Sequence, residues 1–201
     1  MNYKMFKLQD IADISVGKPF KTAVEKVDEE TQARLIQIGD LTSGRFEHVD
    51  SLASVKLERG DEKFALQEQD ILIPLRGSSL SANFYLQSSE FMTITTSQIA
   101  TIRAKGMTSP GYLCWYFNSM NGFRRLSALH TGTTVSRLTK SALANMEISL
   151  PEVEIQQHIS QIYVNWLQQR FLHLNLVQNG DHIFNDICEK IFKRDDISEL
   201  I

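Results

Sequence analysis

The sequence predicts an α+β domain of mixed strands and short helices, followed by one long C-terminal helix. Short runs rich in β-branched residues, at 70–75 and 91–103, lie between polar loops and are typical of buried strands. The stretch 110–117 opens with proline and is filled with large apolar groups, which favours a short helix. From Glu152 onwards a heptad spacing continues far beyond the length of an ordinary globular helix. Strands and short helices ahead of a long helix therefore predict an α+β fold.

The first third of the chain predicts two elements separated by a polar loop. Apolar residues over 3–16 recur near helical or strand spacing, and Gly17 and Pro19 then end the element. The stretch 34–41 alternates enough for a strand, with a turn expected at Gly39–Asp40.

The middle of the chain predicts three further strands. The compact apolar run 70–75 predicts a buried strand, and its Pro74 suggests an edge position or a bulge. Residues 91–103 predict two strands around the polar break 95–98.

The C-terminal region predicts a helix of about 40 residues, roughly 60 Å long at 1.5 Å per residue. Its apolar stripe follows the 3-4 spacing of a coiled coil and comprises Ile155, Ile159, Ile162, Trp166, Leu176, Ile183 and Ile187. The heptad phase continues across Gly180, which favours one helix, although Asn179–Asp181 is also compatible with a turn between two helices. A lone helix of this length cannot bury its stripe against the preceding 150 residues, so we expect a partner helix, most simply a second copy.

Composition favours a folded cytoplasmic protein. Hydrophobic residues make up 42% of the chain, which is too many for a disordered protein. No apolar run approaches the length that spans a membrane, and the first ten residues lack the apolar core of a secretory signal. The two cysteines, Cys114 and Cys188, lack metal-type spacing, so we expect buried free thiols in a reducing cytosol.

The net charge of −3 conceals a basic segment. Residues 76–140 carry seven lysines and arginines against the single acid Glu90, a local charge of +6. Such a segment would attract phosphate groups. The alternative is a solvated face with scattered cations, and composition does not separate the two.

Motifs of catalytic chemistry are missing. The sequence contains no phosphate-binding glycine loop, no nucleophile elbow, no amino-methyltransferase signature and no nuclease pattern of spaced carboxylates and lysine. Its five histidines form no closely spaced ligand pair. We therefore expect no catalytic residue, no metal and no cofactor.

Two polar loops hold the best candidates for DNA contacts. In the first, Arg76 is suited to a phosphate or a guanine edge, and Asn83 to adenine. The second, after residue 130, combines hydroxyls with two cations, as a phosphate clamp would. The candidate DNA-binding residues are Lys18, Arg76, Ser78, Ser79, Asn83, Thr131, Thr133, Thr134, Arg137 and Lys140. The plainer alternatives are a serine-rich turn and a helix N-cap at Thr134 or Ser136.

Six short motifs occur in a characteristic order. They are Leu8-x-x-Ile11-Ala12 with Gly17, the stretch 34–41, Gln69–Leu72 with Arg76-Gly77, Ser97–Arg103, Tyr112-Leu113, and the segment 131–156. In the last segment a Gly-Thr loop, a Leu-Thr-Lys helix start and a strand ending in Leu-Pro lead into a helix that opens with acidic residues and glutamine. This order resembles the specificity subunit of type I restriction-modification enzymes, except that Gln69 replaces the usual glycine.

The resemblance implies a half-size specificity subunit. Residues 1–150 would form a target-recognition domain, 151–194 the conserved spacer and dimerisation helix, and 195–201 a tail. Family subunits usually carry two domains and two helices, so a half-size chain would pair as a C2 homodimer through an antiparallel coiled coil. Each copy would read one half of a gapped palindrome on double-stranded DNA.

The same resemblance assigns the chemistry to partners. Methyltransferase subunits would dock on the spacer helices, and a restriction subunit would join through them. One alternative is a standalone DNA-binding regulator or decoy with the same domain and no methyltransferase partner. Another is a dimeric scaffold held together by the coiled coil.

Overall fold

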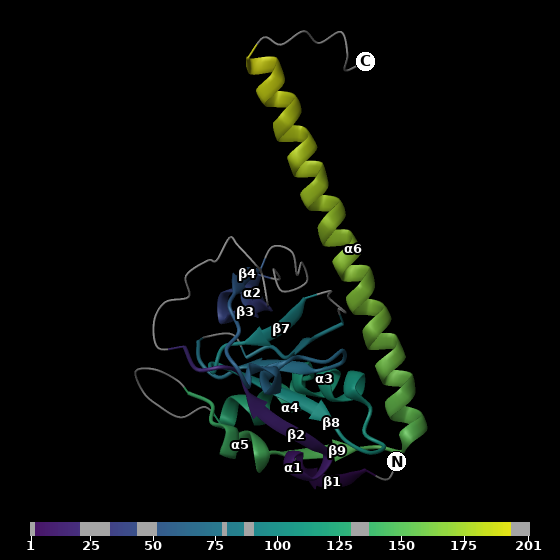
Figure 1. Cartoon of the computed structure of the whole chain (residues 1–201). Coiled ribbons are helices and arrows are strands. Elements are labelled where there is room, and N and C mark those ends of the chain that lie inside the picture. The colour runs from purple at the N-terminus through teal and green to yellow at the C-terminus, as the bar shows by residue number, and fades with distance from the viewer. Residues whose placement is uncertain are drawn as a thin grey trace. The chain divides into compact units, whose positions relative to one another are not determined.

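The computed structural model describes residues 3–20, 33–43, 52–77, 80–86, 91–129 and 137–193. The chain forms two compact units, Met1–Tyr163 and Val164–Ile201. The first unit has mixed strands and short helices, and the second contains the remainder of a long helix (Figure 1). The predicted α+β class with a long C-terminal helix is confirmed.

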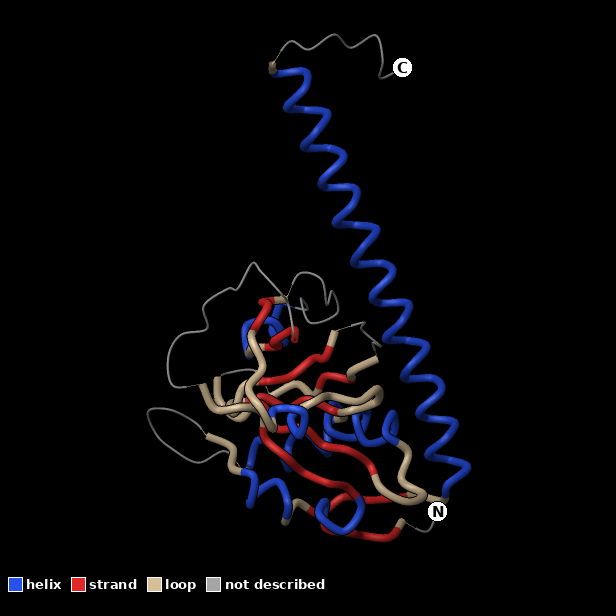
Figure 2. The backbone as a smooth tube through the Cα atoms, in the orientation of Figure 1, coloured by secondary structure: helices blue, strands red, loops and turns tan. Residues whose placement is uncertain are grey.

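Three small sheets form the framework of the first unit (Figure 2). One pairs β1 (Lys4–Lys7) with β9 (Glu147–Leu150) in antiparallel fashion. The four-stranded sheet has the order β2 (Ala12–Val16), β8 (Ile99–Ala104), β5 (Ile71–Pro74) and β6 (Asn83–Phe84). The three-stranded sheet has the order β4 (Ala53–Val55), β3 (Ala33–Ile36) and β7 (Met92–Thr95).

Short helices connect and cover these strands. They are α1 (Leu8–Ile11), α2 (Ile38–Ser43), the 3₁₀ helix η3 (Asp61–Phe64), α3 (Pro110–Asn118), α4 (Met120–Ala128) and α5 (Lys140–Ala144). Helix α3 begins at Pro110 as predicted, and the hydroxyl of Ser109 caps it by accepting from the Tyr112 N–H. Its aromatic side chains Tyr112, Tyr116 and Phe117 are buried and form part of the core.

Strand β5 lies in the core, and all four of its residues are buried. Its neighbour β6 pairs only with Ile71 and Leu72. Pro74 therefore has a paired strand on one side only, and that strand is β8. The predicted edge character of Pro74 therefore has a physical cause, because a proline cannot donate a hydrogen bond to a second neighbour.

Two details differ from the sequence prediction. Gly39 and Asp40 lie inside α2, where the Asp40 carboxylate accepts from the Gln37 N–H at 2.8 Å, so the predicted turn is wrong. This reach-back contact is half of a capping box and favours a helical turn. The two strands expected over 91–103 exist, but β7 pairs in parallel with β3 while β8 pairs with β2 and β5.

Helix α6 (Val153–Phe192) has 40 residues and continues through Gly180. The prediction of a single helix is confirmed, and the alternative of two helices joined by a turn is excluded. None of the helices in the described ranges is long and apolar enough to cross a membrane.

Candidate nucleic-acid interface

The two loops that hold the candidate DNA contacts meet at a backbone bridge. The Leu138 N–H donates to the Leu75 carbonyl at 3.0 Å, and Arg76 stands opposite Arg137 in antiparallel register. Directly opposed residues place their side chains on the same face, with Cβ atoms about 4.5–5.5 Å apart. The fold therefore brings together two arginines that are far apart in the sequence.

These two guanidinium groups are available to an anion. Within the described part of the chain, neither Arg76 nor Arg137 has a carboxylate within ion-pair distance. Like charges placed directly opposite each other are unfavourable, by about 0.2–1 kcal/mol. A bound phosphate would remove this repulsion and accept hydrogen bonds from both side chains.

Helix α5 follows this bridge directly. Its N-cap is Thr139, whose hydroxyl accepts from the Ala142 N–H at 3.1 Å, so the alternative of a cap at Thr134 or Ser136 does not apply to this helix. Lys140 is the first residue of the helix and is exposed. The remaining candidates in the two loops, Ser78, Ser79, Thr131, Thr133 and Thr134, lie outside the described residues.

Asn83 lies on β6, opposite Leu72 of β5. Its neighbours Ala82 and Phe84 are both buried, so the alternation of a strand turns the Asn83 side chain to the other face. Its amide donates to the Ser81 carbonyl at 2.9 Å. Among the described residues no donor is bonded to the Asn83 side-chain oxygen, which leaves it as an acceptor.

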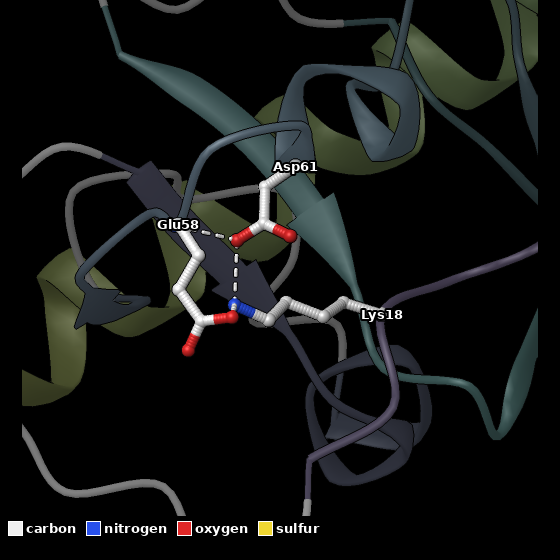
Figure 3. A network of polar contacts seen from close by, with 3 residues as sticks. All are labelled: Lys18, Glu58 and Asp61. Atoms are coloured by element: carbon white, nitrogen blue, oxygen red, sulfur yellow. Dashed lines mark hydrogen bonds and ion pairs between the residues drawn. The ribbon is translucent and has the colours of Figure 1, made fainter.

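Lys18 occupies a different environment (Figure 3). Its ammonium donates to Asp61 and lies 3.7 Å from the Glu58 carboxylate, with only 11% of the side chain exposed. Burial works against the charged form of Asp61, but hydrogen bonds from Lys18 and from the Glu58 N–H outweigh it and lower the pKa of Asp61. A DNA contact by Lys18 stays a prediction. What the structure shows is that its ion pair with Asp61 joins the segment after β2 to η3.

Three cations of the basic segment already have partners elsewhere in the chain. Arg103 binds the buried Asp70 with two hydrogen bonds of 2.7 and 2.8 Å. Lys105 lies 3.2 Å from Asp13, and Arg125 lies 3.3 Å from Glu147. All three acids fall outside 76–140 in the sequence, so the local charge of +6 overstates the positive field in space.

The docking of the start of α6 on the domain was not predicted from the sequence. Gln156 is 3% exposed, accepts from the Ser109 N–H at 3.1 Å and donates to the Pro151 carbonyl at 2.9 Å. One turn later Ser160 packs on Gly111, where an added Cβ would lie only 2.1 Å from the Ser160 hydroxyl oxygen. The next turn contributes Tyr163, whose hydroxyl bonds α3. The sequence signal for this docking face is the spacing of Gln156, Ser160 and Tyr163, which are four and three residues apart and so share one side of a helix.

This docking face and the predicted apolar stripe lie on different sides of the helix. Each docking residue follows a stripe residue by one position, and one position turns the helix by about 100°. Ile155 and Ile159, at the start of the stripe, are half-buried. From Ile162 onwards the stripe is exposed: Ile162 is 71% exposed, Trp166 57% and Leu176 70%.

The cysteines are both free. Cys114 is fully buried on α3, and burial raises the pKa of its thiol to about 12. Cys188 is exposed on α6, so the expectation that both thiols are buried is wrong for this residue. In the described part of the chain, no three His, Cys, Asp or Glu side chains gather in a way that could hold a metal.

Comparison with known proteins identifies the fold. A family described as "Type I restriction modification DNA specificity domain" matches residues 1–167. The structure is similar to the S subunit of a type I restriction-modification system from M. genitalium, with a TM-score of 0.70 and 15% identity over 98% of this chain and 48% of that one. It is also similar to the HsdS subunit of Thermoanaerobacter tengcongensis, with a TM-score of 0.55 and 20% identity over 88% and 40%.

A further similar chain comes from a study of complex assembly and conformational transition in the type I R-M system. Its TM-score is 0.58, with 18% identity over 94% of this chain and 44% of that one. At these identities the likeness concerns the fold alone, and the chain spans about half or less of each of these proteins. No curated protein matches the chain.

Proposed function

The chain belongs to the family of type I restriction-modification DNA specificity domains, and from this we propose that it works as a half-size specificity subunit that dimerises on DNA. The family supplies the DNA specificity of restriction-modification complexes and is not their catalytic part. The observation that carries the proposed DNA face is the bridge that opposes Arg76 and Arg137 without a carboxylate partner among the described residues.

The proposed DNA face combines anchoring and reading. Arg76, Arg137 and Lys140 would contact phosphates, which position a protein on DNA and carry no sequence information. Asn83 has an outward side chain at a strand end, and its amide can bond adenine with two hydrogen bonds. The hydroxyl-bearing residues of the two loops would complete this face.

The proposed dimer rests on the apolar stripe of α6. Its members Ile162, Trp166, Leu176, Ile183 and Ile187 are exposed in the single chain. Pairing with the same stripe of a second copy would remove them from water, and burial of apolar area stabilises by about 25 cal/mol per Å². A C2 pair presents the DNA face twice, so the site should be a gapped palindrome.

Partner subunits would then act on the DNA that this chain recognises. Methyltransferase subunits would dock on the paired α6 helices, and a restriction subunit would join through them. Co-expression with the methyltransferase subunit followed by co-purification tests this assembly. A chain that binds DNA but never carries the methyltransferase would favour the standalone regulator or decoy.

The DNA face is tested with matched arginine variants. Arg76→Ala and Arg137→Ala should weaken binding to all DNA sequences, and the log-log slope of affinity against salt should fall by about 0.9 for each phosphate that the variant no longer binds. Arg125→Ala is the control, because it removes the same charge from a guanidinium that already pairs with Glu147. Equal affinity and equal salt slope in all three variants would contradict the proposed face.

The dimer is tested with two leucines of one helix. Leu176 lies on the stripe, whereas Leu174 is exposed two positions earlier, about 200° around the helix. Leu176→Ala should weaken the dimer by at least about 2 kcal/mol, roughly 30-fold in the dissociation constant, as for a core leucine. Leu174→Ala should leave it unchanged in sedimentation. A wild-type chain that is monomeric at tens of micromolar would exclude the homodimer.

A further inference from the structure

Asn118, the last residue of α3, forms hydrogen bonds with both backbone groups of Ala82. Its amide oxygen accepts from the Ala82 N–H at 3.0 Å, and its amide nitrogen donates to the Ala82 carbonyl at 2.8 Å. One side chain thereby satisfies both backbone groups of one residue, as a neighbouring strand would. Ala82 is 5% exposed, so water offers no easy substitute for these two bonds.

The same amide also reaches helix α6. Its nitrogen lies 2.8 Å from the hydroxyl oxygen of Tyr163 and 3.1 Å from the Cys114 carbonyl. The Cys114 thiol, one turn earlier on α3, lies 3.7 Å from the Ala82 carbonyl and 3.8 Å from the Tyr163 hydroxyl. A single polar cluster therefore joins α3, α6 and the residue that precedes β6.

Ala82 is adjacent to Asn83, and this adjacency gives the cluster a consequence for DNA reading. Fixing both backbone groups of Ala82 fixes the plane in which β6 begins, and with it the direction of the Asn83 side chain. Strand β6 has only two residues, and its pairing with β5 continues at the far end, where the Tyr85 N–H donates to the Asp70 carbonyl at 2.8 Å and the Tyr85 carbonyl accepts from the Gln69 N–H at 2.7 Å. These bonds hold the Tyr85 end of the strand, so the Ala82 end depends on a further restraint. The two hydrogen bonds between the Asn118 side chain and Ala82, which we call the Asn118 clamp, are this further restraint.

We infer that Asn118 is a positioning residue for Asn83, with Tyr163 as the part of the contact that α6 contributes. This inference rests on the proposed function, because it assumes that Asn83 reads a base. Base readout by a bidentate amide depends on orientation, and a good pair discriminates against the wrong base by about 1–3 kcal/mol. Loss of the clamp should therefore relax one base position and not the whole site.

The experiment selects binding sites from a random duplex DNA library with the full chain. Asn83→Ala first identifies the base position whose preference depends on Asn83. Asn118→Asp keeps the size and the acceptor for the Ala82 N–H but replaces the donor, so the preference at that position should fall about ten-fold. Tyr163→Phe, a milder change, should lower the same preference by a smaller factor.

Tyr112→Phe is the matched control. It removes a hydroxyl of α3 that donates to the Ser149 carbonyl on β9, whereas the hydrogen bonds of Ala82 and Asn118 among the described residues do not involve it. It should reduce thermal stability without changing any base preference. Each variant is compared at equal folded fraction, measured by circular dichroism.

The outcomes distinguish failure of the inference from failure of the proposed function. A wild-type chain that selects no sequence refutes the proposed function and the inference with it. A wild-type chain that selects a site, with Asn118→Asp and Tyr163→Phe retaining the preference at the Asn83 position, refutes the inference alone. Equal loss at every position would also overturn it, because that pattern indicates damage to the fold.

Discussion

Replacing Gly111 with alanine should loosen the docking of α6 on α3. The new Cβ would lie 2.1 Å from the Ser160 hydroxyl oxygen, 3.1 Å from its Cβ and 3.3 Å from its Cα. Rotation of the hydroxyl relieves only the first of these contacts. The other two require the helices to move apart by a few tenths of an ångström, which strains the neighbouring Gln156 and Tyr163 hydrogen bonds.

The magnitude follows from two opposing effects. Overpacking typically costs about 1–3 kcal/mol, while exchange of glycine for alanine in a helix returns up to about 1 kcal/mol. We expect a net loss of about 1–2 kcal/mol. For a chain of this size each 1 kcal/mol lowers Tm by about 2–4 °C, so Gly111→Ala should melt about 2–8 °C below wild type.

Two further variants make the test specific. Ser160→Gly removes the hydroxyl oxygen and the Cβ, the two closest of the three atoms, so the double variant should be more stable than the two single losses added together, by at least about 1 kcal/mol. Within the single chain, Gly180→Ala places its added Cβ where nothing lies within 4 Å, and it should raise Tm because alanine has the higher helix propensity. An unchanged Tm for Gly111→Ala, or strict additivity in the double variant, would refute the close contact.

Three other outcomes are expected. The free energy of unfolding should fall as pH drops below about 4, because the lowered pKa of Asp61 stabilises the fold only while its carboxylate is ionised. Asp61→Asn should reduce this loss of stability in urea titrations at about pH 2–5. A thiol reagent at pH 8 should leave Cys114 unmodified in the native protein and modify it in denaturant, because the buried thiol has a pKa of about 12. Deleting residues 167–173 should shorten the gap between half-sites by about 10 Å, roughly three base pairs, with the half-site bases unchanged.

The local elements were largely predictable from the sequence. Proline opened α3, the apolar runs became the buried strand β5, and the unbroken heptad spacing became the single helix α6. These features depend on neighbours within a few residues, where propensity and periodicity act directly. The family resemblance depended on the same short motifs and was confirmed by the match over residues 1–167.

The contacts between distant segments were not predictable. Strands β7 and β8 are neighbours in sequence but belong to different sheets, because pairing partners are chosen by the packing of the whole core. The acids that neutralise Arg103, Lys105 and Arg125 lie outside the basic segment, so counting charge along the chain overestimated the field.

The sequence by itself determined where the helices and buried strands lie, which family the motifs resemble, and which loops carry cations and hydroxyls, because these are properties of local residue order. The tertiary structure alone decided that Arg76 faces Arg137, that Asn118 joins Ala82 to Tyr163, and that the α6 stripe lies about 100° from its docking face. Contacts of this kind close long loops, and only the packing of the complete core selects which segments meet.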